Sequence, residues 1–147
     1  MTLRKVEKEA LATVWALDKA CFADAWTEEM WTSAFARTDF FAYVLETEKG
    51  AQGFVCGTAL FEESELLKIA VCKDSRGNGY GGALLDAFLS ETRLRGAERT
   101  FLEVREGNIP ARRLYESRAF TQTRVRKQYY PDGENAVEMV KTLDGSK

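Results

Sequence analysis

Glycines are concentrated in one short stretch of this chain. Residues 76–82 read Arg-Gly-Asn-Gly-Tyr-Gly-Gly, and they lie between an apolar run at 66–71 and an apolar-periodic stretch at 83–89. A glycine-rich turn between a strand and a helix leaves the first backbone N–H groups of the helix without partners. The helix dipole adds partial positive charge at the same point, so such a turn suits a phosphate group. The sequence therefore predicts a strand–turn–helix unit with a phosphate-binding turn.

Length and charge limit what the chain can be. With 147 residues and 45% hydrophobic content, residues 1–147 are expected to form a single domain with one core. The net charge of −2 gives no sign of a nucleic-acid partner. No signal peptide opens the sequence and no apolar run has membrane-spanning length, so we expect a cytoplasmic protein without membrane contact.

The chain contains no histidine, which restricts its chemistry. Ser-His-Asp catalysis, Cys-His catalysis and histidine-bearing metal centres are excluded, so acid–base steps must use carboxylates, tyrosine, lysine, cysteine or water. Cys21, Cys56 and Cys72 are too far apart in the sequence to indicate a zinc site or a redox pair. We therefore expect free thiols and no metal.

Apolar periodicity predicts a mixed α/β fold. Short apolar or alternating runs indicate strands, and apolar residues at helical spacing indicate helices. The expected strands are 2–6, 40–45, 53–61, 66–71, 100–104, 120–125 and 136–142. The expected helices cover 10–21, begin at Thr27, run from Ala83 to Gly96, and run from an Asn108 cap to Ser117. This order gives a single-domain α+β architecture with a mixed central sheet of about seven strands flanked by about four helices.

The segment 66–104 has the form strand–helix–strand, so its strands 66–71 and 100–104 are expected to run parallel. The glycine turn inside this segment has two interpretations that do not involve an acyltransferase. One is a plain turn between a strand and a helix. Another is a dinucleotide-binding turn, because Gly77, Gly79 and Gly82 satisfy G-x-G-x-x-G. The second fits poorly, because residues 72–76 separate the turn from the strand and the early strands are antiparallel.

Two motifs resemble those of the GNAT acyl-CoA N-acyltransferases. Arg76, Gly79 and Gly81 match the loop R/Q-x-x-G-x-G/A of that family. The segment 108–115, Asn-Ile-Pro-Ala-Arg-Arg-Leu-Tyr, resembles its N-x-x-A-x-x-L-Y helix, and the two motifs occur in the family's order with a strand between them. The resemblance covers nearly the whole chain. One departure is Ala119, where the family has glycine after this helix.

The resemblance implies acetyl-CoA as the co-substrate, without a metal. Backbone N–H groups of Gly77–Gly82 would hold the pyrophosphate, and the strand end Ile69–Val71 would pair with the pantetheine arm. Asn108 would contact the co-substrate with its side chain, although a helix cap alone would also explain this residue. The implied binding residues are Ile69, Ala70, Val71, Arg76, Gly77, Asn78, Gly79, Tyr80, Gly81, Gly82 and Asn108.

Amide formation from a thioester needs a base for the amine and an acid for the departing thiolate. Glu103 is the candidate base, because it lies inside an apolar strand for which we expect helices on both faces. A salt-bridged glutamate, paired for example with Arg105, is the alternative. Tyr115 is the candidate acid, at the position of the family's general-acid tyrosine. Its alternative is an aromatic side chain packed in the core.

The energy of deprotonation favours one acceptor class. At pH 7 an α-amine with a pKa near 7.9 loses its proton at a cost of about 1.2 kcal/mol. A lysine ε-amine with a pKa near 10.4 costs about 4.6 kcal/mol. One glutamate, working through water, suits the first task better, which favours a protein N-terminus without excluding lysine.

Residues 126–131, Arg-Lys-Gln-Tyr-Tyr-Pro, are similar to the R-x-x-Y-Y-P segment of protein N-terminal acetyltransferases of the RimI type. The segments 25–27 and 134–139 resemble two further motifs of these enzymes, with Ala25 and Asn135 as departures. This resemblance implies the N-terminal alanine of a small-subunit ribosomal protein as acceptor. Trp26, Tyr129 and Tyr130 are candidate walls of a peptide groove, although ordinary core and rim packing would also explain them.

Two other functions remain open at this point. A small-molecule amine or lysine acetyltransferase would share the co-substrate site without an open groove for a peptide end. A non-catalytic acyl-CoA-binding module would bind the co-substrate normally and show no turnover. In that case changes at Glu103 or Tyr115 would have no effect on activity.

Overall fold

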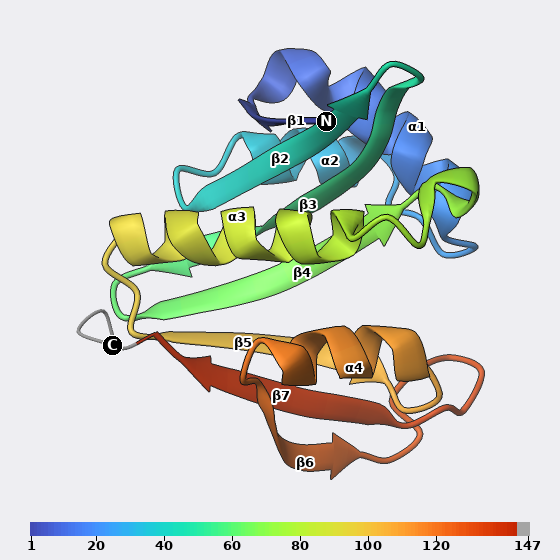
Figure 1. The fold of residues 1–147 in the computed structure, drawn as a ribbon. Coiled ribbons are helices and arrows are strands. Elements are labelled where there is room, and N and C mark those ends of the chain that lie inside the picture. The colour runs from blue at the N-terminus through green and yellow to red at the C-terminus, as the bar shows by residue number, and fades with distance from the viewer. Residues whose placement is uncertain (144–147) are drawn as a thin grey trace.

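One mixed sheet organises the molecule (Figure 1). The computed structural model describes residues 1–143, and its seven strands lie in the order β1-β2-β3-β4-β5-β7-β6. All neighbouring strands are antiparallel except β4 and β5, which are parallel. The strands are β1 (Thr2–Val6), β2 (Phe40–Thr47), β3 (Gly50–Leu60), β4 (Glu63–Val71), β5 (Arg99–Arg105), β6 (Thr121–Arg126) and β7 (Ala136–Thr142). The mixed sheet expected from the sequence is confirmed.

Four helices flank the sheet: α1 (Leu11–Cys21), α2 (Glu28–Phe35), α3 (Tyr80–Leu94) and α4 (Ile109–Ser117). In Figure 1, α3 and α4 lie on one face of the sheet and α1 and α2 lie on the other. Short 3₁₀ turns at Lys8–Ala10 and Lys73–Ser75 precede α1 and the glycine turn. Among residues 1–143 no helix is long and apolar enough to cross a membrane.

Local sequence signals account for where the helices begin. Thr27 caps α2, and its Oγ1 accepts a hydrogen bond from the backbone N–H of Met30 at 3.1 Å. Helix α3 begins at Tyr80, earlier than the Ala83 expected from apolar spacing, because Gly79 adopts a left-handed conformation (φ 77°) and forms the cap. Polar and small residues therefore form the first turn of α3, ahead of its apolar face.

Strands β4 and β5 pair over a short distance only. The parallel register joins Glu63 to Arg99, Ser64 to Thr100 and Glu65 to Phe101. The expected parallel direction is therefore confirmed, and the structure adds that β4 separates from β5 after Glu65, so residues 66–71 do not pair with β5. Figure 1 shows the widening gap between the two strands.

A bulge explains why β4 turns away. The β3–β4 register shifts between Cys56 and Gly57, which pair with Lys68 and Leu66 and leave Leu67 unpaired. An extra residue in one strand bends that strand and increases its twist. The backbones approach so closely here that a Cβ at Gly57 would overlap the Glu65 carbonyl and the Phe88 ring. The bend is therefore built into the sheet.

Apolar side chains fill both sides of the sheet. Beneath α3, Phe41 stacks on Phe88 with ring centroids 5.0 Å apart, and both are buried. Beneath α1 and α2, Trp31 is completely buried and its ring meets Phe54 at 5.7 Å. Helices α1 and α2 pack on β2, β3 and β4 and not on β5. One face of β5 is buried (Thr100, Leu102 and Val104), while Phe101, Glu103 and Arg105 on its other face are only partly buried.

Helix α4 ends in a hydrogen-bonded cap that involves Tyr115. The N–H of Phe120 donates to the Tyr115 carbonyl at 3.1 Å, and the N–H of Ala119 donates to the Glu116 carbonyl at 3.0 Å. This is the Schellman pattern, and the Tyr115 and Phe120 rings, 5.8 Å apart, supply its apolar contact. Ala119 has φ 70°, in the left-handed region where glycine is preferred.

We predict that Ala119→Gly stabilises the protein. Alanine in the left-handed region costs roughly 1–2 kcal/mol, and glycine removes this strain. Part of the gain is offset, because glycine loses more conformational entropy than alanine on folding. We expect a gain of about 1 kcal/mol in the free energy of unfolding, measured by urea denaturation. Ser117→Gly in the last helical turn is the control, and it should destabilise by about 0.5–1 kcal/mol. A destabilised Ala119→Gly variant would contradict the strain at this position.

Candidate active site

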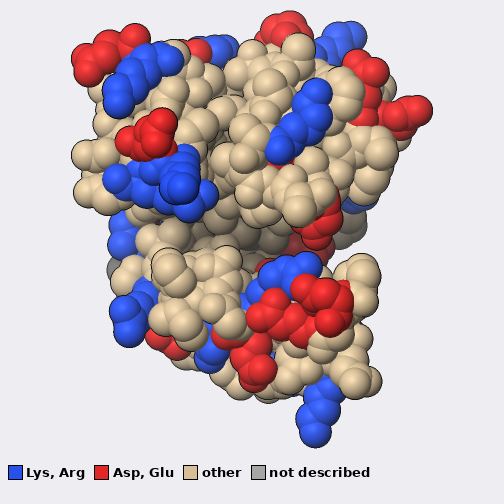
Figure 2. Space-filling model, turned by 90° about the vertical axis from the view of Figure 1, so that its right-hand side faces the viewer, with Lys and Arg blue, Asp and Glu red and all other residues tan. Residues whose placement is uncertain are grey.

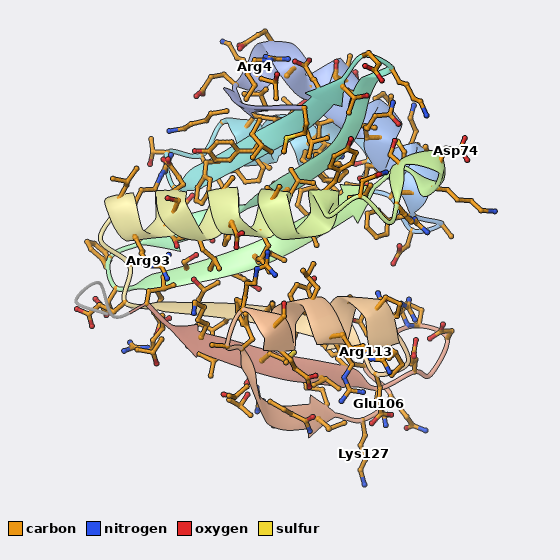
Figure 3. The ribbon with its side chains drawn as sticks, viewed as in Figure 1. Arg4, Asp74, Arg93, Glu106, Arg113 and Lys127 are labelled. Carbon is orange, nitrogen blue, oxygen red and sulfur yellow. The ribbon has the colours of Figure 1, made fainter. Side chains whose placement is uncertain are left out.

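A hollow crosses the end of the molecule where β4 and β5 have separated (Figure 2). Asp74 lies in the loop that follows β4 and Glu106 follows the end of β5, so the two mark opposite sides of this opening (Figure 3). On the side that faces the hollow, the segment Ile69–Val71 has no strand partner among the described residues. Apart from the Val71 carbonyl, which accepts a hydrogen bond from Arg76, the backbone groups on this side can bind an extended ligand as an added strand.

The glycine turn lies at the edge of this hollow. Gly77 and Gly79 have φ values of 85° and 77°, and a Cβ added at either position would meet nothing within 4 Å. In the described part of the chain, the backbone N–H groups of residues 77–82 donate to no carbonyl or side chain. Open space beside unpaired donors at a helix N-terminus fits a phosphate group.

The side chains around the turn brace it from behind. Arg76 Nε donates to the Val71 carbonyl at 3.0 Å, and Asn78 Nδ2 donates to the Ser75 carbonyl at 2.9 Å. Ser75 Oγ in turn donates to Gln52 Oε1 on β3 at 2.7 Å. Both side chains are thus engaged within the turn. Contact of Arg76 and Asn78 with a co-substrate stays a prediction, and in this structure it would be made by their backbone N–H groups.

Asn108 caps α4. Its Oδ1 accepts a hydrogen bond from the backbone N–H of Ala111 at 3.3 Å. Asn108 is therefore a helix cap, as the sequence alternative expected. Its Nδ2 group has no hydrogen bond to another described residue. Contact between Asn108 and a co-substrate stays a prediction.

Glu103 lies on the face of β5 that α1 and α2 leave open. The expectation that helices cover both faces of β5 is wrong, because α1 and α2 pack on β2, β3 and β4 instead. The Glu103 side chain therefore keeps 24% of its surface exposed. Arg126 Nε on β6 lies 2.6 Å from Glu103 Oε2. The Glu103 carboxylate also raises the pKa of the neighbouring Tyr129 through a hydrogen bond and its charge. The structure therefore surrounds Glu103 with polar groups instead of apolar packing.

Tyr115 comes from the last turns of α4 and is 5% exposed. Burial, and then the nearby Tyr130, raise the pKa of its phenol above the ordinary value. Its hydroxyl donates to no other described residue, so the proton is free for a ligand. The ring of Tyr115 also packs against Phe120, as the core-packing alternative expected.

Tyr129 and Tyr130 lie in the segment that joins β6 to β7, and their rings meet edge to face at 5.1 Å. Arg105 holds this segment. Its guanidinium lies 4.1 Å from the centre of the Tyr130 ring and bonds Asp132 at 2.9 Å and Glu134 at 3.0 Å. The proposed Glu103–Arg105 pair is therefore not formed, since Arg126 takes that place. A hydrogen bond from Tyr129 to Glu103 raises the pKa of Tyr129, while burial and then the charge of Glu103 raise the pKa of Tyr130. Tyr130 in turn adds to the raised pKa of the buried Tyr115.

Trp26 lies apart from these tyrosines, in the loop between α1 and α2. Its backbone N–H donates to Asp18 Oδ2 at 3.0 Å and its carbonyl accepts from Trp15 Nε1 at 3.0 Å. Lys68 Nζ lies 5.0 Å from its ring centre and 2.7 Å from Asp18 Oδ1. Trp26, Met30, Phe40 and Leu67 line a cavity of about 360 Å³.

The buried Asp18 fixes this loop, and sequence reasoning did not single it out. Asp18 has no exposed surface, and its oxygens bind Lys68, the Trp31 indole and the Trp26 backbone. Asp18, Arg105 and Arg126 resemble ordinary surface charges in the sequence, and only their partners across the fold mark them as organising residues. Arg126 alone carried a signal, because it opens the segment Arg-Lys-Gln-Tyr-Tyr-Pro.

Two of the cysteines are neighbours in space. Burial, and then the nearby Cys72 thiol, raise the pKa of Cys21. Cys21 ends α1 and Cys72 follows β4, and both are free thiols. The expected free thiols are confirmed, and the fold adds that Cys21 and Cys72, distant in the sequence, lie near each other.

Comparison with known proteins decides the family. The sequence profile described as the acetyltransferase (GNAT) family matches residues 11–120. A curated relative from Escherichia coli strain K12, a ribosomal protein bS18-alanine N-acetyltransferase, is 30% identical over 141 residues, 94% of this chain and 95% of the relative. The chain belongs to the GNAT acetyltransferase family.

Solved structures agree with this assignment. The crystal structure of the ribosomal-protein-S18-alanine N-acetyltransferase from Escherichia coli has a TM-score of 0.90 and 30% identity, covering 97% of this chain and 93% of that one. Arabidopsis thaliana NAA60 in complex with acetyl-CoA shares the fold, with a TM-score of 0.85 and 16% identity, covering 98% and 99% of the two chains. The chain is thus an acetyl-CoA-dependent N-acetyltransferase of the GNAT fold.

We predict that Lys68→Met destabilises this GNAT enzyme. The variant leaves the buried Asp18 carboxylate without its cation, a loss that typically costs about 3–5 kcal/mol. Urea denaturation of Lys68→Met and of Asp18→Asn/Lys68→Met measures the effect, and the double variant should lose less than the sum of its single variants. Lys73→Met in the nearby 3₁₀ turn is the control and should stay within about 0.5 kcal/mol of the wild type. Additive losses would show that the pair is not coupled.

Proposed function

We propose that this enzyme transfers the acetyl group of acetyl-CoA to the N-terminal α-amine of a protein. The proposed acceptor is the N-terminal alanine of a small-subunit ribosomal protein. The observation that supports the proposal is the opening of the sheet, with an unpaired edge at Ile69–Val71 beside the open glycine turn and Glu103 on the neighbouring strand β5. The curated relative named for this activity, 30% identical over 94% of the chain, supports it.

Each of the two central residues has one proton to move. Glu103 accepts a proton from the acceptor's ammonium group, directly or through water, so that the neutral amine attacks the thioester carbonyl. The C–N bond forms as the C–S bond breaks. Tyr115 gives its proton to the departing thiolate, and the second proton of the newly acylated nitrogen passes through water to the phenolate, which restores Tyr115. Its raised pKa keeps the phenol protonated at neutral pH, so the proton is in place when the C–S bond breaks.

Backbone groups hold the co-substrate in this proposal. The N–H groups of Gly77–Gly82 bind the diphosphate, and the free edge at Ile69–Val71 pairs with the pantetheine arm. Asn108 contributes its free Nδ2. Acetyl-CoA supplies an activated acyl group, and the chain supplies orientation together with the two proton transfers.

A peptide fits the walls of the hollow better than a small amine does. Trp26 lies on the α1–α2 side, while Tyr129 and Tyr130 lie on the β6–β7 side. The two sides approach each other at Arg105, whose Nη2 lies 3.9 Å from Asp24 Oδ2. The cavity of about 360 Å³ behind Trp26 offers apolar space for a side chain that follows the acceptor residue.

An acceptor comparison tests this function. A basic peptide that begins with alanine should be acetylated much faster than polyamines, amino sugars or a peptide whose only free amine is a lysine side chain. Mass spectrometry of protein N-termini, with and without the enzyme, identifies the acceptor in cells. A clear preference for a small amine or for lysine would reject the proposal.

We predict that Tyr115→Phe lowers kcat by roughly 10²–10⁴-fold, because the leaving thiolate loses its proton donor. Calorimetry should show nearly unchanged binding of acetyl-CoA, since the ring remains in place. Tyr43→Phe is the matched control. Tyr43 lies on β2, away from the hollow, and its hydroxyl donates to Glu91 of α3 at 3.1 Å. Its kcat should stay near the wild-type value. Wild-type turnover in Tyr115→Phe would remove Tyr115 from the reaction.

A further inference from the structure

A second carboxylate lies beside Glu103 at the point where the sheet opens. Glu65 and Phe101 form the last register pair between β4 and β5. Side chains alternate along a strand, so Glu103, two residues after Phe101, lies on the same face as Glu65. The charge of Glu103 reaches Glu65 and raises its pKa, after partial burial as the larger cause. The two carboxylates therefore face one space from neighbouring strands.

Glu65 differs from the other acids nearby because it has no cation. Glu63, on the same strand, pairs with Arg99 at 3.5 Å, and Glu103 pairs with Arg126 at 2.6 Å. Among residues 1–143, no Lys or Arg nitrogen lies within 4.0 Å of the Glu65 carboxylate. An exposed carboxylate near a second one, without a counter-ion, favours the binding of an external cation.

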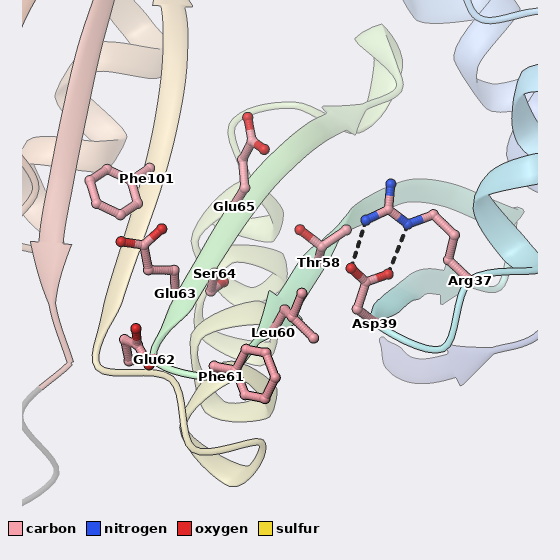
Figure 4. A pocket seen from close by; sticks show the side chains of 10 residues that line it. All are labelled: Arg37, Asp39, Thr58, Leu60, Phe61, Glu62, Glu63, Ser64, Glu65 and Phe101. Atoms are coloured by element: carbon pink, nitrogen blue, oxygen red, sulfur yellow. Dashed lines mark hydrogen bonds and ion pairs between the residues drawn. The ribbon is translucent and has the colours of Figure 1, made fainter.

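The space beside Glu65 is large enough for a ligand. Glu65 and Phe101 line a cavity of about 520 Å³, together with Thr58 (Figure 4). Arg37 is the basic residue on this wall, but Asp39 holds it through hydrogen bonds of 2.8 and 2.6 Å. Figure 4 shows Arg37 and Asp39 bound to each other on this wall. The charge of Arg37 acts on Glu65 and lowers its pKa, against the larger effect of burial, but among residues 1–143 Glu65 forms no ion pair of its own.

We propose that Glu65 binds the protonated α-amine of the acceptor beside Glu103 before transfer, and that it thereby selects cationic N-termini. This inference rests on the proposed function. The ammonium group lies between the two carboxylates, and Glu103 then removes its proton. Tyr129, whose pKa both carboxylates raise, forms the remaining side of this binding space. Glu65 acts on binding, because it takes no part in breaking the thioester.

The first experiment compares Glu65→Gln with Glu63→Gln in the full chain, using a basic peptide that begins with alanine. Glu65→Gln should raise the KM for the peptide about tenfold, because one charge-assisted hydrogen bond is lost. Its kcat should stay within about threefold, and the KM for acetyl-CoA should not change. Glu63→Gln removes the same charge from the same strand, and its peptide KM should stay within about twofold of the wild type. Equal effects of both changes would overturn the proposal.

A second measurement isolates the ammonium group. Calorimetry with CoA present should show that Glu65→Gln weakens binding of the free-amine peptide about tenfold, while binding of the N-acetylated peptide is unchanged. Equal losses for both peptides would overturn the proposal, since they would indicate a general change in the groove. If the wild-type chain neither binds nor acetylates the peptide, the proposed function fails as well. If it acetylates the peptide and Glu65→Gln behaves like the wild type, this inference alone fails.

Discussion

The separation of β4 from β5 is the constraint on which the rest of the site depends. A sheet that continued past Glu65 and Phe101 would pair every backbone group of Ile69–Val71 and close the hollow. The bulge at Leu67 prevents this, and the close approach at Gly57 keeps the bend in place. The unpaired edge is then exposed as a template for an extended ligand, a role that an ordinary sheet edge must avoid.

The bend requires firm support on both sides of the opening. On one side, the buried Asp18 ties the loop of Trp26 to Lys68 of β4. On the other side, Arg105 ties the β6–β7 segment to β5 through Asp132 and Glu134. Charged groups hold these loops because loops bury too little apolar surface to be fixed by packing alone. The two walls can thus keep their spacing while the sheet between them stays open.

Features that depend on neighbouring residues could be predicted from the sequence. The positions of the strands along the chain, the caps at Thr27 and Asn108 and the glycine turn follow from local propensity and motif spacing. The length of the β4–β5 pairing could not be predicted, because a bulge depends on cross-strand register. The partner of Glu103 and the contact of Cys21 with Cys72 also escaped prediction, since both join segments that are distant in the sequence.

Environment distinguishes the roles of the two titratable groups at the hollow. Tyr115 is buried against Phe120, and burial raises the pKa of its phenol, which keeps it protonated for the acid role proposed above. Glu103 lies on the open face of β5 beside Arg126, where the proposed acceptor amine can reach its carboxylate. Their separation follows from the sheet itself, because helices cover β5 on the side of α4 and leave its other side open. The same bend that opens the sheet therefore leaves room between the proposed acid on α4 and the proposed base on β5.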